Sequence, residues 1–276
     1  MDEADIRKVV RKRYAEAARQ SCSCRSPSCC GDNDSVSRTL GYSEAELASL
    51  PEGADLGLGC GNPTALASLA EGEVVLDLGS GAGIDCFLAA QAVGGTGRVI
   101  GVDMTTDMID RARANAARNG IGNVEFRLGE IEHLPVADGE VDVVISNCVI
   151  NLSPDKPQVF REAFRALKPG GRLIVSDIVA LAELPDAIRS SLDAYAGCIA
   201  GALRKEEYLA AIADAGFREV EVEKEVVFDA ALSGDGDPTL VVDGKTTTPE
   251  DVGLTSEEAR RLAASMASIG VRATKP

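Results

Sequence analysis

The stretch VVLDLGSGAG, which runs from Val74 to Gly83, decides the fold that this sequence predicts. Its first half is a continuous apolar run that carries one acid, Asp77, and such runs are typical of buried parallel strands. Its second half places Gly79 and Gly81 ahead of the final glycine, with one residue between each. Glycines at this spacing let a chain turn tightly beneath a ligand. The stretch therefore predicts a strand followed by a ligand-binding turn.

The sequence after this turn alternates between apolar runs and amphipathic stretches. The apolar runs are RVIGVD, VEFRLG, VDVVISN and RLIVSDI, and helical stretches such as DMIDRARANAARNG lie between them. Apolar strands separated by amphipathic helices indicate a parallel sheet that is covered on both faces. We therefore predict a doubly wound α/β fold, whose ligand lies beyond the carboxyl ends of the strands.

The residues before this core follow other patterns. Residues 5–20 have the apolar spacing of an amphipathic helix, whereas residues 21–41 lack any periodicity and predict an irregular loop. Ser43 begins a capping-box pattern for a short helix, and Asn62 is the expected N-cap of another. The N-terminal part is thus expected to be helical and rich in cysteine.

Beyond residue 180 the alternation loosens. We expect these elements there: helices over 186–195 and 205–215, a strand over 219–228, and a final helix and strand. The organisation that follows has three parts: an N-terminal helical segment (1–70), a donor-binding domain (71–180) and a smaller C-terminal α+β substrate domain (181–276).

Charge and composition exclude several classes of function. The formal net charge is −16, so the chain would repel the phosphate backbone of nucleic acid. The first residues mix charges throughout and no apolar run reaches membrane-spanning length, so we expect a cytoplasmic monomer with no membrane partner. His133 is the sole histidine, and a catalytic triad or a zinc site with several imidazoles therefore lacks its residues.

The glycine turn does not have the spacing that a dinucleotide requires. A fingerprint that starts at Gly79 needs a glycine where Ile84 stands, and one that starts at Gly81 needs a glycine where Cys86 stands. The GxGxG spacing after an acid-bearing strand instead resembles the class I methyltransferases, whose donor S-adenosylmethionine carries no pyrophosphate. The resemblance implies that Gly79 and Gly81, with Asp77 before them, bind the methionine part of this donor.

Residues that follow the next strands complete the expected donor site. Asp103 ends the second strand, and its carboxylate can accept hydrogen bonds from both ribose hydroxyls. The resemblance implies that Met104 flanks the adenine and that Glu130 and the Ile131 backbone read the adenine edge. Asn147 is expected to close the pocket. For Asp103 taken alone, a cap on the following helix is the better interpretation, but the turn and the acids in this order favour donor binding.

The cysteines are the remaining distinctive residues of the sequence: Cys22, Cys24, Cys29, Cys30, Cys60, Cys86, Cys148 and Cys198. In a cytosolic protein, clustered cysteines indicate metal binding or catalysis more often than structural disulfides. Cys60 lies in a glycine-rich turn, Cys148 follows the last strand of the donor site, and Cys198 lies beyond the sheet. Three soft thiolates suit a soft, three-coordinate centre.

Each cysteine also has a structural interpretation, because free cysteine is often a small core residue. Cys86 lies on the apolar face of the expected helix IDCFLAA and is expected to be a core residue. Cys148 alone fits the core and a ligand about equally well. Cys60 has little to pack against in its turn, so the ligand interpretation is stronger there.

The motifs GLGCGNP, VLDLGSGAGIDCF, GEIEHLP, SNCVINLSPDK, LKPGG and AGCIAGAL together resemble the prokaryotic arsenite methyltransferases. The resemblance spans about residues 41–220 and includes the C-terminal SIGVRATKP. It implies that Cys60, Cys148 and Cys198 bind As(III), whose lone pair attacks the methyl group of S-adenosylmethionine.

The resemblance also implies a disulfide relay. Each methylation formally oxidises arsenic to As(V), so thiols must return it to As(III) and are left as a disulfide for thioredoxin or glutathione to reduce. The relay cysteine falls in the pair Cys29 and Cys30, and the spacing favours Cys30. Cys22 and Cys24 could join this pair as a soft-metal clip or belong to an irregular loop.

Two other functions remain open from the residues alone. One is methylation of an organic small molecule by an enzyme whose cysteines are buried and incidental. The other is a non-catalytic, thiol-based metalloid sensor, although a sensor needs no donor site. The substrate expected from the resemblance is arsenite or a thiol conjugate of As(III).

Overall fold

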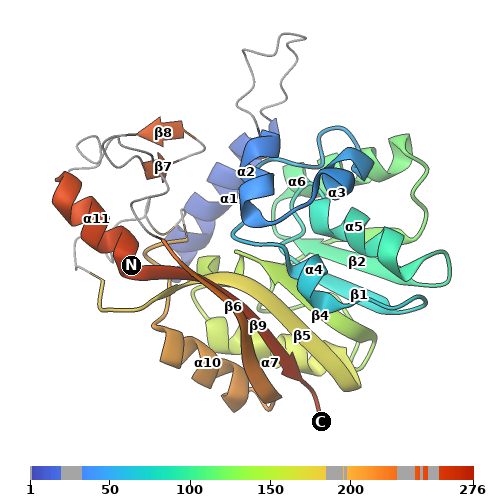
Figure 1. Cartoon of the computed structure of the whole chain (residues 1–276). Helices are drawn as coiled ribbons and strands as arrows, with labels where there is room; N and C mark the ends of the chain where they lie inside the picture. The colour runs from blue at the N-terminus through green and yellow to red at the C-terminus, as the bar shows by residue number, and fades with distance from the viewer. Residues whose placement is uncertain are drawn as a thin grey trace, which may run out of the picture.

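Figure 1 shows the computed structural model of the chain. The structure describes residues 2–19, 33–184, 195, 198–228, 240–242, 245–247 and 255–276. Cys22, Cys24, Cys29 and Cys30 lie outside the described residues, as do nearly all of the helix expected over 186–195 and most of the segment between 229 and 254. The relay cysteine is therefore not placed by this structure.

Within the described residues, seven strands form one sheet in the order β3-β2-β1-β4-β5-β9-β6. Their bounds are β1 Val74–Leu78, β2 Arg98–Asp103, β3 Val124–Leu128, β4 Val141–Asn147, β5 Leu167–Ala180, β6 Arg218–Val227 and β9 Met266–Thr274. Strands β3, β2, β1, β4 and β5 run parallel to one another, which confirms the predicted core. Strand β9 is antiparallel to both β5 and β6, an arrangement that the sequence pattern does not reveal.

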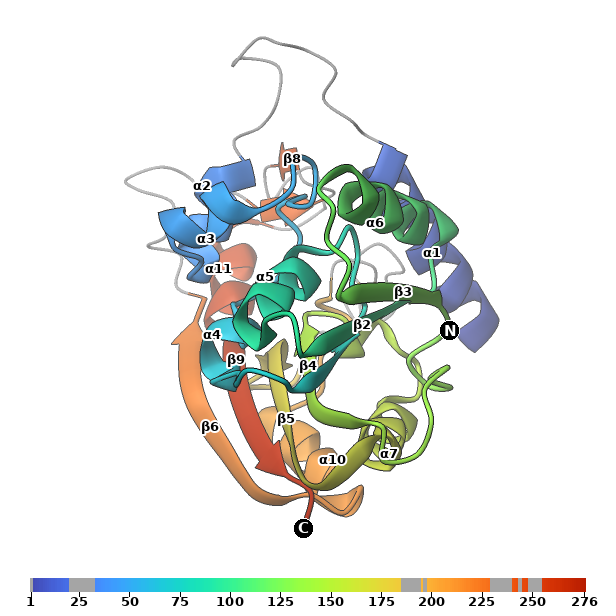
Figure 2. The same cartoon turned by 90° about the vertical axis from the view of Figure 1, so that its right-hand side faces the viewer.

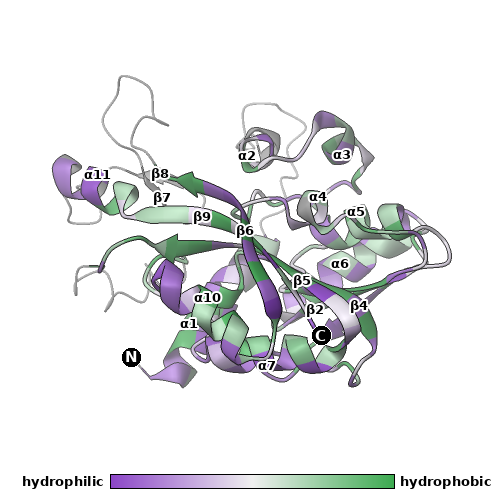
Figure 3. Cartoon of the chain, turned by 60° about the horizontal axis from the view of Figure 1, so that its bottom comes forward, coloured by the Kyte–Doolittle hydropathy of each residue, from purple (hydrophilic) through white to green (hydrophobic). Residues whose placement is uncertain are grey.

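Helices cover both faces of the sheet (Figure 2). On one face lie α4 (Pro63–Ala67), α5 (Ile84–Val93) and α6 (Thr106–Arg118), whose apolar side chains share one cluster with β1 and β2. On the other face lie α7 (Lys156–Ala166) and α10 (Lys205–Asp214), which bury Phe160 and Tyr208 in the largest cluster. In Figure 3 the central strands are mostly hydrophobic, whereas the helices combine hydrophobic and hydrophilic residues. The doubly wound fold is thus confirmed.

The N-terminal elements lie beside the carboxyl ends of the strands. Helix α1 (Glu3–Arg19) packs against α6 and against the short 3-10 helix η1 (Ile150–Leu152), and Figures 1 and 2 both place it beside α6. The capping box of Ser43 and Glu46 begins α3 (Glu44–Ser49), and Asn62 caps α4, as predicted. These local signals were sufficient because each cap involves residues only three positions apart.

One prediction in this region was wrong. Residues 33–40, expected to belong to an irregular loop, form the helix α2 (Asn33–Leu40). Gly41 ends the helix with φ +106°, and the buried Ser37 hydroxyl donates a hydrogen bond of 2.9 Å to Asp55 Oδ1. A two-turn polar helix has little periodicity to detect, and here a tertiary contact supports it.

The C-terminal part adds α11 (Ser256–Ala264) and a small two-stranded sheet of β7 (Leu240–Val242) and β8 (Lys245–Thr247). The expected helix over 205–215 and strand over 219–228 correspond to α10 and β6. Strands β6 and β9 come after residue 180 in the sequence and continue the main sheet. The division of the chain into three parts, with a boundary at residue 180, stays a prediction. In the part of the chain that the structure describes, no helix combines the length and apolarity needed to cross a bilayer.

Candidate active site

The glycine turn after β1 has the shape that the sequence predicts. Gly79 and Gly81 have φ values of +69° and +52°, which favour glycine. The backbone N–H of Gly79 donates to Val102 O at 2.8 Å, so the turn is held against β2. A Cβ on Gly79 would lie 2.4 Å from Val149 Cγ2, whereas a Cβ on Gly81 would meet nothing within 4 Å. The turn is therefore closely packed at Gly79 and leaves open space at Gly81, as a ligand-binding turn requires.

Asp103 lies next to this turn and connects it to α6. Its Oδ2 accepts a hydrogen bond of 3.0 Å from Gly81 N, and its Oδ1 accepts one of 2.8 Å from Thr105 N. Burial raises the pKa of this carboxyl, and the two backbone N–H donors act against that shift. Each oxygen keeps a further lone pair, so the carboxylate can support the loop and the start of α6 and still accept ribose hydroxyls.

The other expected donor residues are spread around the same edge of the sheet. Asp77 is buried beneath the turn, where Cys86 Sγ donates to its Oδ2 at 3.2 Å. Ile131 belongs to the main core, and Met104 packs against the apolar cluster that contains the thiols. Met104, which the resemblance places beside the adenine, thus lies against the same cluster as Cys148 and Cys198.

Glu130 faces helix α1. Its carboxylate forms ion pairs with Arg11 at 3.1 Å and with Arg7 at 3.8 Å, and Arg7 also pairs with the buried Glu132 at 3.5 Å. A hollow of about 560 Å³ lies between α1 and the first residues of α6, with Glu130 in its wall. Helix α1 therefore covers the side of the site where the adenine edge is expected.

Asn147 connects the donor side to the turn of Cys60. Its Nδ2 lies within hydrogen-bonding distance of Tyr42 Oη (2.9 Å), Gly61 O (2.9 Å) and Asp85 Oδ2 (3.1 Å). Its Oδ1 accepts a hydrogen bond of 2.9 Å from Cys60 N. One side chain at the end of β4 thus holds the cysteine turn in place through both of its polar atoms.

The structure brings the three predicted ligand cysteines together. Cys60 and Cys148 form a disulfide with a Cα–Cα distance of 5.4 Å, and Cys198 Sγ donates a hydrogen bond of 3.1 Å to Cys148 O. All three belong to or pack against one apolar cluster, which includes Ile6 and Val10 of α1. Among the described residues, no group of three or more His, Cys, Asp or Glu side chains is arranged to hold a metal ion.

The backbone is strained at two of these cysteines. Cys148 has φ +57° and Cys198 has φ +64°, and in the described ranges only Ser68 and Glu219 are other non-glycine residues with positive φ. Such a conformation costs about 1–3 kcal/mol per residue and persists where the surrounding structure imposes it. Strain at these two positions is typical of a functional site.

Two buried ionisable groups, Asp177 and Lys156, interact electrostatically with Cys198. Burial raises the pKa of the Cys198 thiol to about 12, with the nearby Asp177 carboxylate adding to the effect. Burial also raises the pKa of Asp177 to about 7 and lowers the pKa of Lys156 to about 8. At neutral pH, Cys198 is therefore held as a thiol in an apolar setting.

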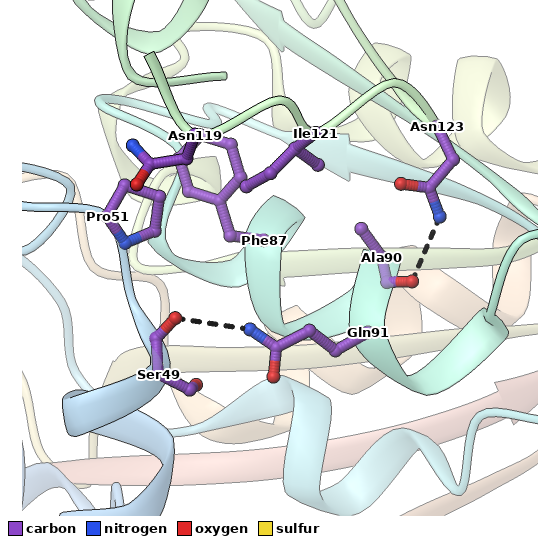
Figure 4. A pocket seen from close by; sticks show the side chains of 8 residues that line it. All are labelled: Ser49, Pro51, Phe87, Ala90, Gln91, Asn119, Ile121 and Asn123. Carbon is purple, nitrogen blue, oxygen red and sulfur yellow. Dashed lines mark hydrogen bonds between the residues drawn. The ribbon is translucent and has the colours of Figure 1, made fainter. Parts of the chain in front are cut away.

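Figure 4 shows a second hollow that lies apart from these residues. It has a volume of about 310 Å³ and is lined by Ser49, Pro51, Phe87, Ala90, Gln91, Asn119, Ile121 and Asn123. Gln91 Nε2 and Asn123 Nδ2 donate to the backbone oxygens of Ser49 (3.4 Å) and Ala90 (3.0 Å). No lining residue is an acid, base or thiol, so this hollow lacks the groups for the predicted chemistry.

Three residues of the site were not singled out from the sequence. Tyr14, expected only as part of an apolar helix face, packs against the cluster that contains Cys148 and Cys198. Tyr42 donates a hydrogen bond of 2.7 Å to the buried Asp85, whose pKa is raised by burial to about 6. An acid in the otherwise apolar helix IDCFLAA was a usable signal, because a buried carboxyl needs partners. The two tyrosines gave no comparable signal.

The fold and the glycine-loop site are those of a class I, S-adenosylmethionine-dependent methyltransferase. Residues 69–216, more than half of the chain, match the family model described as a methyltransferase domain. The chain is 33% identical to a solved arsenic (III) S-adenosylmethionine methyltransferase from Chlamydomonas reinhardtii, with a TM-score of 0.61, and the match covers 86% of this chain and 72% of that one. The chain belongs to the arsenite methyltransferase family.

Two curated relatives have the same description. The arsenite methyltransferase of Halobacterium salinarum is 52% identical over 80% of this chain and 59% of its own length. That of Aquipseudomonas alcaligenes is 41% identical over 81% of this chain and 66% of its own length. The chain thus spans about three fifths to two thirds of the length of these relatives.

Proposed function

We propose that this chain methylates trivalent arsenic with S-adenosylmethionine, and that Cys60, Cys148 and Cys198 hold the arsenic. The observation that carries the proposal is the meeting of three cysteines in one apolar cluster beside the glycine turn. Relatives described as arsenite methyltransferases support the choice of substrate. Soft thiolate ligands suit a soft arsenic centre.

When bound, S-adenosylmethionine supplies an electrophilic methyl group on a sulfonium. The chain's own part on this side is to bind and orient. The open space at Gly81 leaves room for the donor, the Asp103 carboxylate accepts ribose hydroxyls, and Glu130 with Met104 and Ile131 holds the adenine. Positioning of this kind contributes up to about 7–11 kcal/mol in well-oriented reactions.

Arsenic binding requires the three sulfurs to be free. A dithiol or glutathione first reduces the disulfide between Cys60 and Cys148. Arsenous acid, As(OH)₃, then exchanges its three hydroxyls for three sulfurs, and each hydroxyl leaves as water with one thiol proton. The raised pKa of Cys198 is compatible with this exchange, because the incoming group arrives as a thiol and its proton leaves with the hydroxyl.

Methyl transfer forms an As–C bond while the C–S bond of the sulfonium breaks and S-adenosylhomocysteine leaves, and it formally oxidises As(III) to As(V). Two As–S bonds then break as their sulfurs couple to a disulfide, which leaves an electron pair on arsenic and returns it to As(III). Water supplies a hydroxyl to the methylated arsenic and releases one proton. Cys60 and Cys148 are placed to make that disulfide. Our proposal keeps Cys30, or its neighbour Cys29, as the relay that passes the oxidation on to thioredoxin or glutathione. This need for reduced thiols fits the cytoplasmic monomer that the sequence predicts.

The test is methylation by the purified chain. With arsenite, S-adenosylmethionine and a thiol reductant, the chain is expected to form methylated arsenicals that chromatography with mass detection resolves. Cys198→Ser is expected to lose this activity, whereas Cys86→Ser, which keeps a donor toward Asp77 in the core, is expected to retain it.

Three results would contradict the proposal. Full activity in Cys198→Ser would exclude the thiolate mechanism. Methyl transfer to an organic small molecule but not to arsenite would favour the other enzyme class. Binding of arsenite with no methylated product in the presence of donor would favour a metalloid sensor.

A further inference from the structure

The turn around Cys60 lies against three neighbouring strands of the sheet. Strands β4, β5 and β9 are adjacent in the strand order, and each has one polar residue beside the turn: Asn147, Ser176 and Ser268. Asn147 pairs with Ser176 of β5, and Ser268 pairs with Ile178, two residues further along the same strand. The turn is therefore packed against β4, β5 and β9 at once.

The backbone of Cys60 is held from both sides. Its N–H donates to Asn147 Oδ1 at 2.9 Å, and its carbonyl oxygen accepts a hydrogen bond of 2.7 Å from Ser268 Oγ. The next residue, Gly61, lies close to β5, since a Cβ there would be 2.9 Å from Ser176 Cβ. Two hydrogen bonds and one close contact thus fix the backbone from which the Cys60 side chain projects.

Ser268 is the first residue of the C-terminal motif SIGVRATKP and belongs to β9. Side chains in a strand alternate between the two faces of the sheet. Ala267 is buried in the core that α7 and α10 cover, whereas Met266 belongs to the cluster of Cys148 and Cys198. Ser268 shares the face of Met266, and its hydroxyl bonds a cysteine turn 208 residues away in the sequence.

We propose that Ser268 is a positioning residue of the acceptor site, whose hydroxyl holds the Cys60 carbonyl and so keeps the Cys60 sulfur directed toward Cys148 and Cys198. This inference rests on the proposed function and adds to it a residue of the C-terminal strand. Because the hydroxyl bonds the Cys60 turn, its loss is expected to weaken arsenic binding more than donor binding. Strand β9 pairs with β5 on one side and β6 on the other, so it keeps its place without the hydroxyl.

The experiment compares Ser268→Ala, which removes the hydroxyl, with Ser268→Thr, which keeps one. The reduced protein is titrated by calorimetry with arsenite in the absence of donor, and separately with S-adenosylmethionine. In Ser268→Ala the arsenite affinity is expected to fall about fivefold, the effect of one lost hydrogen bond, with donor affinity within about twofold of the original. In Ser268→Thr the arsenite affinity is expected to recover.

Thr274→Val is the matched control on the same strand. It removes a hydroxyl that donates to Arg218 O at 3.3 Å, near the other end of β9. The variant loses a hydrogen bond of the same kind but not the one to Cys60. It is therefore expected to change neither affinity by more than about twofold.

A second measurement does not involve arsenic. In glutathione buffers of graded oxidation, Cys60 and Cys148 exchange between the disulfide and the free thiols. A less ordered Cys60 turn must be ordered when the disulfide forms, so Ser268→Ala is expected to shift this equilibrium about fivefold toward the thiols. Differential alkylation with mass detection measures the shift for these two cysteines.

Weaker arsenite binding in Ser268→Ala supports the positioning role even if no methylated product forms. Unchanged arsenite affinity would overturn it, and so would an equal loss of arsenite and donor affinity, which indicates a merely structural serine. Normal methylation by the original chain with unchanged binding in Ser268→Ala would overturn the role of Ser268 and leave the proposed function intact. If the original chain binds no arsenite, the proposed function fails, and the thiol equilibrium still decides whether Ser268 positions Cys60.

Discussion

The glycine turn and Asp103 of the proposed donor side lie in one contiguous piece of chain, whereas the proposed acceptor side is assembled from segments far apart in the sequence. The turn from Gly79 to Gly83 and the acid Asp103 belong to a single strand–helix–strand unit, β1-α5-β2. Cys60 and Cys148 are 88 residues apart, and Cys198 comes from the segment between β5 and α10. The glycine turn owes its shape to its backbone, whereas the three cysteines are held together by contacts between distant segments. Substitutions on the two sides should therefore differ in their effects on stability, donor affinity and the KM for arsenite.

The largest expected effect belongs to Gly79→Ala. The new Cβ would lie 2.4 Å from Val149 Cγ2 in a backbone with φ +69°, and Val149 directly follows Cys148. We expect the free energy of unfolding to fall by about 3 kcal/mol or more, since left-handed strain and overpacking add. Donor affinity, measured by calorimetric titration with S-adenosylmethionine, should fall together with stability.

Gly120→Ala is the matched control for this change. Gly120 has φ +64°, but a Cβ there meets nothing within 4 Å. It should therefore lose only about 1 kcal/mol of stability from backbone strain and keep its donor affinity. Equal losses of donor affinity in the two variants would show that the close packing of the turn is not what shapes the donor side.

The next prediction tests whether Asn147 links the donor side to the acceptor side. Asn147→Ala removes the hydrogen-bond partner of Cys60 N and that of Asp85 Oδ2, while Asp85 Oδ1 keeps its bond from Tyr42, so stability should fall by about 2 kcal/mol. The KM for arsenite should rise more than the KM for the donor, because the Cys60 turn loses its anchor. Steady-state kinetics with each substrate varied in turn measures both.

Asn123→Ala provides the comparison for this variant. Asn123 lines the hollow of Figure 4, which has no cysteine in its wall. Its Nδ2 donates to Ala90 O and Gly94 O, both at 3.0 Å. It should lose similar stability yet keep both KM values within about twofold, since each lost bond is local. An equal rise of the arsenite KM in this variant would mean that general loosening, not the Cys60 anchor, is responsible.

The smallest expected effect concerns the carboxyl behind Cys198. Burial raises the pKa of Asp177 from 3.8 to about 7, so the folded state binds this proton more tightly than the unfolded state. The resulting stabilisation is complete below about pH 4 and is lost as the pH rises through about 7. Asp177→Asn should therefore flatten the decline in stability between pH 5 and 8 by on the order of 2 kcal/mol.

Urea unfolding at several pH values measures this slope. Asparagine can still accept from Ile178 N, which bonds Asp177 Oδ1 at 2.9 Å, so the variant is expected to fold. The same decline with pH in both proteins would show that Asp177 is not the group that titrates.

Local chemistry let the sequence determine the strand, the glycine turn and the helix caps. The acid-bearing strand, the glycine spacing and the caps at Ser43 and Asn62 each depend on residues that are neighbours in the chain. Their φ values and hydrogen bonds follow from residue type, which is why strand, turn and parallel core could all be predicted. The three ligand cysteines were found through motif resemblance, not through any local physical rule.

Only the tertiary structure decided how the acceptor side is arranged. It joins Cys60 to Cys148, packs Tyr14 against the cluster that contains Cys148 and Cys198, and places β9 between β5 and β6. These contacts connect segments with no shared periodicity, and the packing of the whole core selects them. The strained backbone at Cys148 and Cys198 has the same origin, because a non-glycine residue keeps a positive φ only when surrounding contacts outweigh its cost.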